Sequence, residues 1–177
     1  MAKILVTGGA GYIGSHTCIQ LLSAGHDVVV LDNLSNSSVE SLARVQALAA
    51  KKLDFVEGDI LDQQIIDQIF QHHSIDAVIH FAGLKAVGES QKEPLKYFEN
   101  NISGSISLVK AMERAQVFKL VFSSSATVYD EANISPLNET MPTGMPSNNY
   151  GYTKLIVEQL LEKLSAADER WSIALLR

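Results

Sequence analysis

The chain of 177 residues has one cysteine, four prolines and no long apolar run. Because Cys18 has no partner in the sequence, a disulfide framework is excluded. No segment approaches the roughly 18 apolar residues that a membrane-spanning helix requires. The opening Met-Ala-Lys also lacks the apolar region of a signal peptide. We therefore expect a cytoplasmic protein with no membrane partner.

Positive charge is scarce as well, with 14 Lys and Arg residues against 20 Asp and Glu residues, a net charge of -6. Such a balance argues against nucleic acids and anionic membranes as partners. The few histidines do not show a ligand spacing, since the adjacent His72 and His73 point in different directions. We predict no metal site.

A glycine-rich turn follows the predicted strand at residues 4–6 and opens into a predicted helix. Its glycines fit G-x-G-x-x-G as Gly9, Gly11 and Gly14, and G-x-x-G-x-x-G from Gly8 onward. Glycine lets bare backbone approach a pyrophosphate, and the helix N-terminus supplies N–H donors. The lysine of a P-loop is missing. Similar turns also occur in loops that bind nothing, so the pattern needs support from its context.

The context is an acidic residue at the tip of the second predicted strand. Residues 27–31 form that strand, and Asp32 ends it about twenty residues after the glycines. A carboxylate in this position accepts hydrogen bonds from an adenosine ribose and repels a 2′-phosphate, which favours NAD over NADP. The alternative is that Asp32 only caps the loop that follows.

Apolar runs of strand length alternate with helical periodicity along the chain. Further strands are predicted at 53–56, 76–81, 120–123 and 171–177. Helices are predicted at about 13–22, 62–72, 94–115 and 149–164, with a long surface loop over 130–149. This alternation indicates an α/β fold, a doubly wound parallel sheet of the Rossmann type covered on both faces. We predict one NAD-binding domain over residues 1–177.

Three polar residues near the predicted sheet edge could carry chemistry. Ser125 follows the strand at 120–123, where doubly wound sheets place ligands. Tyr150 and Lys154 are four residues apart on a predicted helix and share one face. A phenol is a poor base at neutral pH, but a neighbouring ammonium favours the phenolate. The pair is an acid/base candidate; a solvated helix face is the alternative.

Several segments together resemble the extended short-chain dehydrogenase/reductases and, among these, the UDP-glucose 4-epimerase family. They are residues 6–16, 31–34, 57–60, 80–90, 123–129 and 150–154. The glycine and Tyr-x-x-x-Lys motifs mark the superfamily, whereas 80–90 and the Ser-Ser-Ala-Thr run are more specific to the epimerases. Related dehydratases carry an Asp-Glu pair where this chain has Ala126 and Thr127, which argues against dehydration.

The resemblance implies a bound NAD and transient oxidation at sugar C4, which interconverts UDP-galactose and UDP-glucose. It implies Ser125, Tyr150 and Lys154 as catalytic residues. The cofactor-binding residues that it implies are Gly8, Gly11, Tyr12, Ile13, Gly14, Asp32, Asn33, Leu34, Asn36, Asp59, Ile60, Phe81, Ala82, Gly83, Lys85 and Asn100. It also implies a homodimer formed by the helices predicted at 94–115 and 149–164.

The resemblance covers this whole chain but only about the first half of a family member. We therefore expect the substrate domain to be absent here, or supplied by a separate C-terminal polypeptide. Asp130 stands where the family has glycine, which would change the loop near the substrate. We expect weak NAD binding and little or no epimerisation by these residues alone. The alternatives are another nucleotide-sugar epimerase and a non-catalytic NAD-binding regulatory protein.

Overall fold

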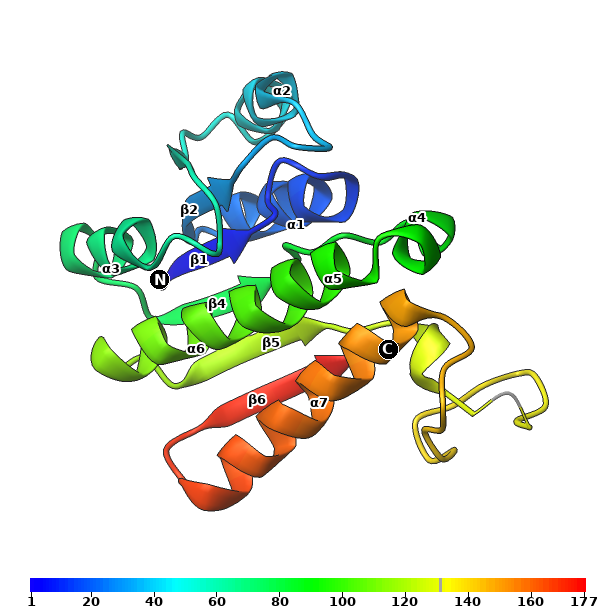
Figure 1. The fold of residues 1–177 in the computed structure, drawn as a ribbon. Helices are drawn as coiled ribbons and strands as arrows, with labels where there is room; N and C mark the ends of the chain where they lie inside the picture. The colour runs from blue at the N-terminus through cyan, green and yellow to red at the C-terminus, as the bar shows by residue number, and fades with distance from the viewer. Residues whose placement is uncertain (131) are drawn as a thin grey trace.

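A six-stranded parallel sheet forms the centre of the computed structural model, which describes residues 1–130 and 132–177 (Figure 1). The strand order is β3-β2-β1-β4-β5-β6. The strands are β1 (Lys3–Thr7), β2 (Asp27–Asp32), β3 (Asp54–Glu57), β4 (Ala77–His80), β5 (Lys119–Ser123) and β6 (Ser172–Leu176). This order, with every neighbouring pair parallel, confirms the predicted doubly wound fold.

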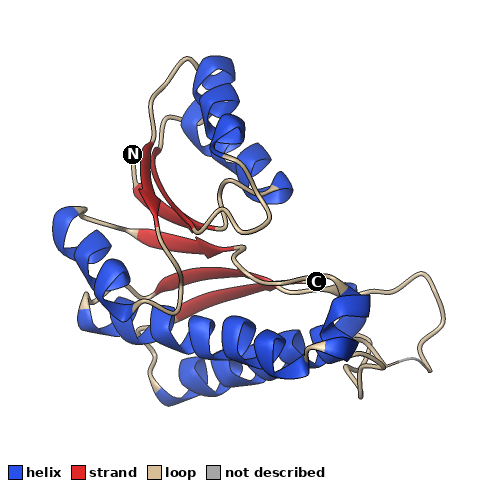
Figure 2. Ribbon diagram, turned by 45° about the horizontal axis from the view of Figure 1, so that its top comes forward, coloured by secondary structure: helices blue, strands red, loops and turns tan. Residues whose placement is uncertain are grey.

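Helices connect the strands and lie on both faces of the sheet (Figure 2). They are α1 (Tyr12–Ser23), α2 (Val39–Ala49), α3 (Gln63–His72), α4 (Val87–Lys92), α5 (Pro94–Tyr97), the π segment η1 (Phe98–Ser103), α6 (Gly104–Arg114), the 3-10 turn η2 (Ala126–Val128) and α7 (Asn149–Ala167). Among the described residues, no helix is long and apolar enough to cross a membrane.

Side chains of β1 and β2 alternate between two apolar layers, as expected for strands buried on both sides. Leu5 and Val29 join the layer under α3, α6 and α7, whereas Val6 and Val30 join the layer under α1 and α2. The predicted covering of both faces does not extend to β6. There Ser172, Ala174 and Leu176 are exposed on one side and alternate with half-buried residues on the other.

Helix α2 is missing from the sequence prediction. Its start is a conventional one, because the Ser38 hydroxyl accepts a hydrogen bond from the Glu40 N–H. Only Leu42 and Val45 are buried on it, so the apolar face of this helix is narrow. The available signal for this helix was a capping residue, Ser38, followed by the apolar residues Leu42 and Val45, three positions apart.

The helix predicted at 94–115 is interrupted. The run from Pro94 to Arg114 consists of α5, η1 and α6, so six residues in its middle have π geometry. Short helix α4, just before it, was not predicted. A π segment adds a residue to a helical turn and is typical of sites where a side chain is aimed at a partner. Here it contains Asn100 and Asn101.

The stretch predicted as a loop over 130–149 has no helix or strand in its described part before α7 begins at Asn149. A single antiparallel bridge joins Tyr129 to Thr143. Glu131, which falls within this prediction, lies outside the described residues.

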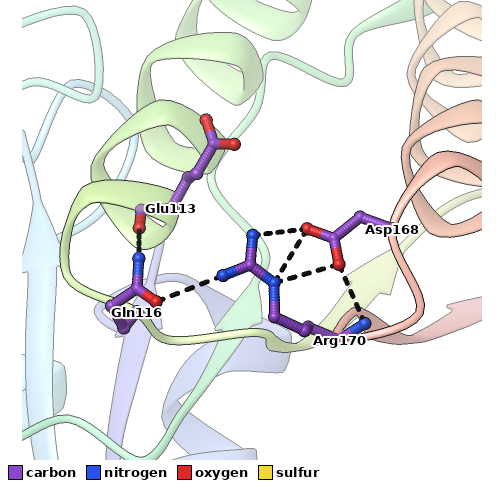
Figure 3. A network of polar contacts seen from close by, with 4 residues as sticks. All are labelled: Glu113, Gln116, Asp168 and Arg170. Atoms are coloured by element: carbon purple, nitrogen blue, oxygen red, sulfur yellow. Dashed lines mark hydrogen bonds and ion pairs between the residues drawn. The ribbon is translucent and has the colours of Figure 1, made fainter.

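A polar network joins the two connections that lead into β5 and β6 (Figure 3). Arg170 pairs with Asp168 through Nη2 at 2.7 Å and donates from Nη1 to Gln116 Oε1 at 3.2 Å. Its guanidinium also lies 4.4 Å from the centroid of the Phe118 ring. These contacts are at the amino ends of the strands, and we assign them a role in holding the connections together.

Leu108 is fully buried on α6, whereas Leu48 on α2 is 73% exposed, and the two provide a matched test of the core. Leu108→Ala leaves a cavity and should lower the free energy of unfolding by about 2–5 kcal/mol. Leu48→Ala should change it by no more than about 0.5 kcal/mol. Urea unfolding followed by circular dichroism measures both. Equal losses would contradict the position of the core.

Candidate active site

A cleft lies where β1, β2, β4 and β5 end, at the point where the strand order reverses. Doubly wound sheets bind ligands in this position. The cleft is lined by Gly8, Gly11, Tyr12, Ile13, Gly14, Leu31, Asp32, Asn33, Ser35, Asn36, Gly58, Ile60, Phe81, Ala82, Gly83, Leu84, Lys85, Asn100, Ser123, Ser124, Tyr150 and Lys154. It therefore brings the glycine turn together with the Tyr150–Lys154 pair, although they are far apart in sequence.

Most of the predicted site residues line this cleft. Leu34, Asp59 and Ser125 do not. Leu34 and Asp59 are hydrogen-bonded to the lining residues Asp32 and Asn33, whereas Ser125 directly follows the lining residue Ser124 and is hydrogen-bonded to Thr127. The lining residues that the sequence prediction omitted are Leu31, Ser35, Gly58, Leu84, Ser123 and Ser124. Each of them lies within two residues of a predicted site residue, so the cleft extends slightly beyond the predicted motifs.

The glycine turn packs backbone against backbone. Gly8 has a φ of +71°, and a Cβ added to it would lie 2.6 Å from the backbone nitrogen of Ala82. A Cβ on Gly14 would overlap the Gly8 carbonyl oxygen. At the N-cap of α1, Gly11 has no side chain to occupy the first N–H groups of the helix. The turn thus leaves those donors facing the cleft, which fits a pyrophosphate.

Asp32 both shapes the cleft and faces it. Its carboxylate accepts hydrogen bonds from the Ala10 N–H at 3.0 Å, the Leu34 N–H at 2.9 Å and the Ser37 hydroxyl at 2.8 Å. Asp32 is 8% exposed. Because a carboxylate has about four acceptor sites, capacity is left for a ribose hydroxyl. Loop capping and ligand binding, posed as alternatives for this residue, are therefore compatible.

Asp59 acts on the cleft through Asn33. Its Oδ2 accepts a hydrogen bond of 2.8 Å from Asn33 Nδ2, and its Oδ1 accepts one from the Leu61 N–H. Leu34, which directly follows Asn33, has a positive φ of 55°. This tight turn after β2 directs Asn33 and Asn36 toward the cleft, where both are lining residues.

A buried chain of hydrogen bonds runs beneath the cleft. Ser105 donates to the Asn101 carbonyl, so its oxygen accepts from His80 Nε2 at 2.9 Å. His80 Nδ1 must then accept from the Thr7 hydroxyl at 2.7 Å. Thr7, His80, Ser105 and Asn101 are each 4% exposed or less. Burial, together with the charge of Lys154, lowers the pKa of His80 to about 3, so this imidazole stays neutral.

Asn101 extends this chain to the helix that carries Tyr150. Its side chain accepts from the Leu84 N–H at 2.8 Å and donates to the Leu84 carbonyl at 2.9 Å. It also donates to the Thr153 hydroxyl, which donates to the Tyr150 carbonyl. The sequence prediction missed Asn101; its only signal was a second asparagine beside Asn100 in an otherwise helical pattern.

Lys154 is buried at the back of the cleft. Its ammonium donates a 2.8 Å hydrogen bond to the Ser123 carbonyl and lies 4.7 Å from the centroid of the Phe122 ring. Burial lowers its pKa to about 8, and the opposite charge of Glu158 limits the fall. Such a shift in a cleft is typical of functional sites.

Tyr150 is held at the first turn of α7, which the Asn148 side chain caps by accepting from the Gly151 N–H. The backbone N–H of Tyr150 donates to the Ser90 hydroxyl at 3.2 Å. Tyr150 and Lys154 line the cleft together. The arrangement places a phenol and an ammonium beside the carboxyl end of β5.

Ser125 caps the turn η2. Its hydroxyl oxygen accepts from the Thr127 N–H at 3.2 Å and from the Thr127 hydroxyl at 2.9 Å. Both of these bonds use lone pairs of Ser125, so its own O–H proton is left to donate to another group.

The structure shows how the chain accommodates Asp130. Its Oδ1 accepts from the Ala132 N–H at 2.8 Å, and its side chain lies against Gly144, where an added Cβ would overlap it. Among the described non-glycine residues, φ is positive only at Leu34, Ala50 and Gln116. Position 130 therefore does not require glycine in this loop.

Sequence comparison identifies the family. Residues 4–177 match the NAD dependent epimerase/dehydratase family. The chain belongs to this family. It is 58% identical over 174 residues to the UDP-glucose 4-epimerase of Bacillus subtilis (strain 168), covering 98% of this chain and 51% of that protein. It is 54% identical to the Neisseria meningitidis serogroup B enzyme of the same name, covering 100% and 52%.

Solved structures of epimerases in this family superpose closely on the chain. UDP-glucose-4-epimerase from Stenotrophomonas maltophila, with bound NAD and formylated UDP-arabinopyranose, has a TM-score of 0.96 at 51% identity, covering 100% of this chain and 52% of that chain. The Bifidobacterium longum enzyme, in complex with NAD+ and UDP, has a TM-score of 0.97 at 46% identity, covering 99% and 52%. The chain thus spans about half the length of these relatives.

Within the part of the chain that the structure describes, no group of His, Cys, Asp or Glu residues could hold a metal ion. Buried Cys18 is far from ionising, because burial raises the pKa of its thiol to about 12.

The buried neutral His80 should make stability depend on pH. Unfolded, a histidine takes up a proton near pH 6.5, but folded His80 does so only near pH 3. Between these values the unfolded chain binds the extra proton. The stabilisation from His80 is thus complete above pH 6.5 and is lost at about 1.4 kcal/mol per pH unit as the pH falls toward 3.

Urea unfolding between pH 4 and pH 7 measures this slope. His80→Gln should flatten it, whereas the same change at the exposed His72 should leave it as in the parent chain. An equally steep slope in the His80 variant would show that other groups cause the acid sensitivity.

Proposed function

We propose that the chain is the NAD-binding half of a UDP-glucose 4-epimerase. One observation carries this proposal: a single cleft joins a glycine turn and Asp32 to the Tyr150–Lys154 pair. The NAD and UDP-sugar complexes of relatives with nearly the same backbone support it. When bound, NAD supplies a reversible hydride acceptor.

The residues of the cleft divide into those that hold the cofactor and those that act on the sugar. The backbone from Gly8 to Gly14 and the start of α1 would hold the pyrophosphate, because the glycines of this turn have no side chains to cover their backbone N–H groups. Asp32 would bind the adenosine ribose, with Asn33 beside it. The other residues that the family resemblance implies as cofactor-binding are also proposed as contacts. Leu34 and Asp59 would act through the residues to which they are hydrogen-bonded.

Tyr150 would move the proton of the reaction. Its phenolate accepts the proton of the sugar 4-hydroxyl as C4 is oxidised, and returns it when C4 is reduced on the other face. The ammonium of Lys154, one helical turn away, favours the phenolate through its charge. The free O–H proton of Ser125 would orient the sugar oxygen. The keto sugar stays tethered by its diphosphate while it turns over.

The whole activity needs more than these residues. The relatives are about twice as long, and we propose that uridine diphosphate and the sugar are gripped by the sequence corresponding to their second half, on the same or another polypeptide. A homodimer is supported by the exposed Leu95 of α5 and by the half-exposed aromatic pair Phe98–Tyr152. We also propose a cytoplasmic location.

A wider sugar range is the second candidate. A structure with a TM-score of 0.93 at 38% identity, covering 100% of this chain and 53% of that chain, is a UDP-Glc/GlcNAc 4-epimerase from Campylobacter jejuni. The cleft described here contains the cofactor side of the site, which would be shared by epimerases that differ in the sugar substituent.

Asp32→Ser tests the cofactor assignment. Loss of the carboxylate should weaken NAD binding at least tenfold and should improve the affinity for NADP relative to NAD, because the charge that repels the 2′-phosphate is removed. Isothermal titration of both nucleotides gives the ratio. Glu57→Gln, at the tip of the next strand and outside the cleft, is the control. A general loosening of the glycine loop would weaken both nucleotides equally and would contradict ribose binding.

Tyr150→Phe tests the chemistry. We expect no significant turnover of UDP-galactose by the chain alone, and turnover when it is joined to the second half of the Bacillus subtilis relative. In that fusion Tyr150→Phe should lower kcat at least 100-fold with NAD still bound. Tyr152→Phe removes a phenol from the same helix without touching the cleft and should keep full activity. Retained turnover in the Tyr150 variant would refute the assignment.

A further inference from the structure

A buried ion pair lies one turn of α7 beyond Lys154. Glu158 follows Lys154 by four residues on α7, so Tyr150, Lys154 and Glu158 lie along the same face of the helix. The Glu158 side chain is 1% exposed. A carboxylate this deeply buried is costly unless it is paired and hydrogen-bonded.

Its partner is Arg177, which follows β6. Arg177 Nη2 lies 2.8 Å from Glu158 Oε2, and Arg177 Nε lies 3.1 Å from each carboxylate oxygen. This bidentate contact fixes the plane of both groups. The Arg177 side chain is itself only 16% exposed.

Arg177 also reaches the turn that carries Ser125. Its guanidinium carbon lies 5.4 Å from the centroid of the Tyr129 ring. Tyr129 is 7% exposed and directly follows η2, which the Ser125 side chain caps. One guanidinium therefore joins α7, the end of β6 and the Ser125 turn.

The charged and titratable groups around Lys154 come from several elements. Tyr150 and Glu158 are on α7, His80 is on β4, and Lys85 is on the loop after β4. His80 is neutral, and Glu158 is the group whose charge supports the Lys154 ammonium. Because Arg177 neutralises much of that charge, the support is smaller than an unpaired carboxylate would give.

We propose that the Glu158–Arg177 ion pair is a positioning element of the active site, which fixes α7 against the Ser125 turn and sets the negative charge that Lys154 experiences. Neither residue lines the cleft, so both act through Lys154, Tyr150 and Ser125. The inference rests on the proposed function only for the roles of those three residues.

The pair predicts opposite effects for its two members. Glu158→Gln removes a negative charge near Lys154 and should lower the pKa of its ammonium. Arg177→Gln leaves the carboxylate uncompensated and should raise that pKa. The double variant, with two amides that can hydrogen-bond to each other, should return it toward the parent value. We expect each single shift to be at least about 0.5 pH units.

Titration of the 13C-lysine-labelled chain by NMR measures this pKa without cofactor or sugar. Lys154→Arg identifies the signal, and Glu162→Gln, an exposed change one turn further along α7, is the matched control. Shifts of the same sign in both single variants, or no shift in either, would overturn the proposal. A purely structural pair would lower the melting temperature without separating the two pKa values.

Arg177→Lys covers the case in which a glutamine variant does not fold. It keeps the positive charge but loses the bidentate geometry, so the Lys154 pKa should stay near that of the parent while the melting temperature falls. A large pKa change in this variant would also overturn the proposal. Because no reaction is followed, these results are independent of the turnover test of Tyr150.

Discussion

The site depends on the buried chain of hydrogen bonds that begins at Thr7 and ends at the backbone of Tyr150. It passes through His80, Ser105, Asn101 and Thr153, all of which are buried. A donor or acceptor left unpaired at this depth would cost about 1–3 kcal/mol. The glycine turn after β1 and the start of α7 therefore cannot shift independently, and the two parts of the cleft keep one spacing.

The sheet and the glycine turn were predictable because they depend on short-range patterns. An apolar run fixes a buried strand, and the close approach at Gly8 is imposed by the turn itself. The position of Asp32 at the end of β2 could also be predicted, because it follows from the length of a strand-helix-strand unit.

The remaining features were hidden because they depend on contacts between distant segments. The π segment places Asn101 under Leu84, seventeen residues earlier, and a helical pattern alone does not reveal that constraint. In the sequence His80 is one polar residue in an apolar strand, and its tautomer is set by Ser105 on helix α6. In the sequence, Glu158 is an ordinary helix carboxylate and Arg177 an ordinary strand-end arginine. Only the structure shows that the two side chains are buried together as an ion pair.

Strand β6 is one of the two outer strands of the described sheet, and its exposed side includes Leu176, which is 53% exposed. An outer strand offers a row of backbone donors and acceptors, here next to an apolar side chain. Extended segments of other chains can pair with such an edge without entering the cleft. Pairing of this kind would extend the sheet, and charged or proline substitutions along β6 would disfavour it.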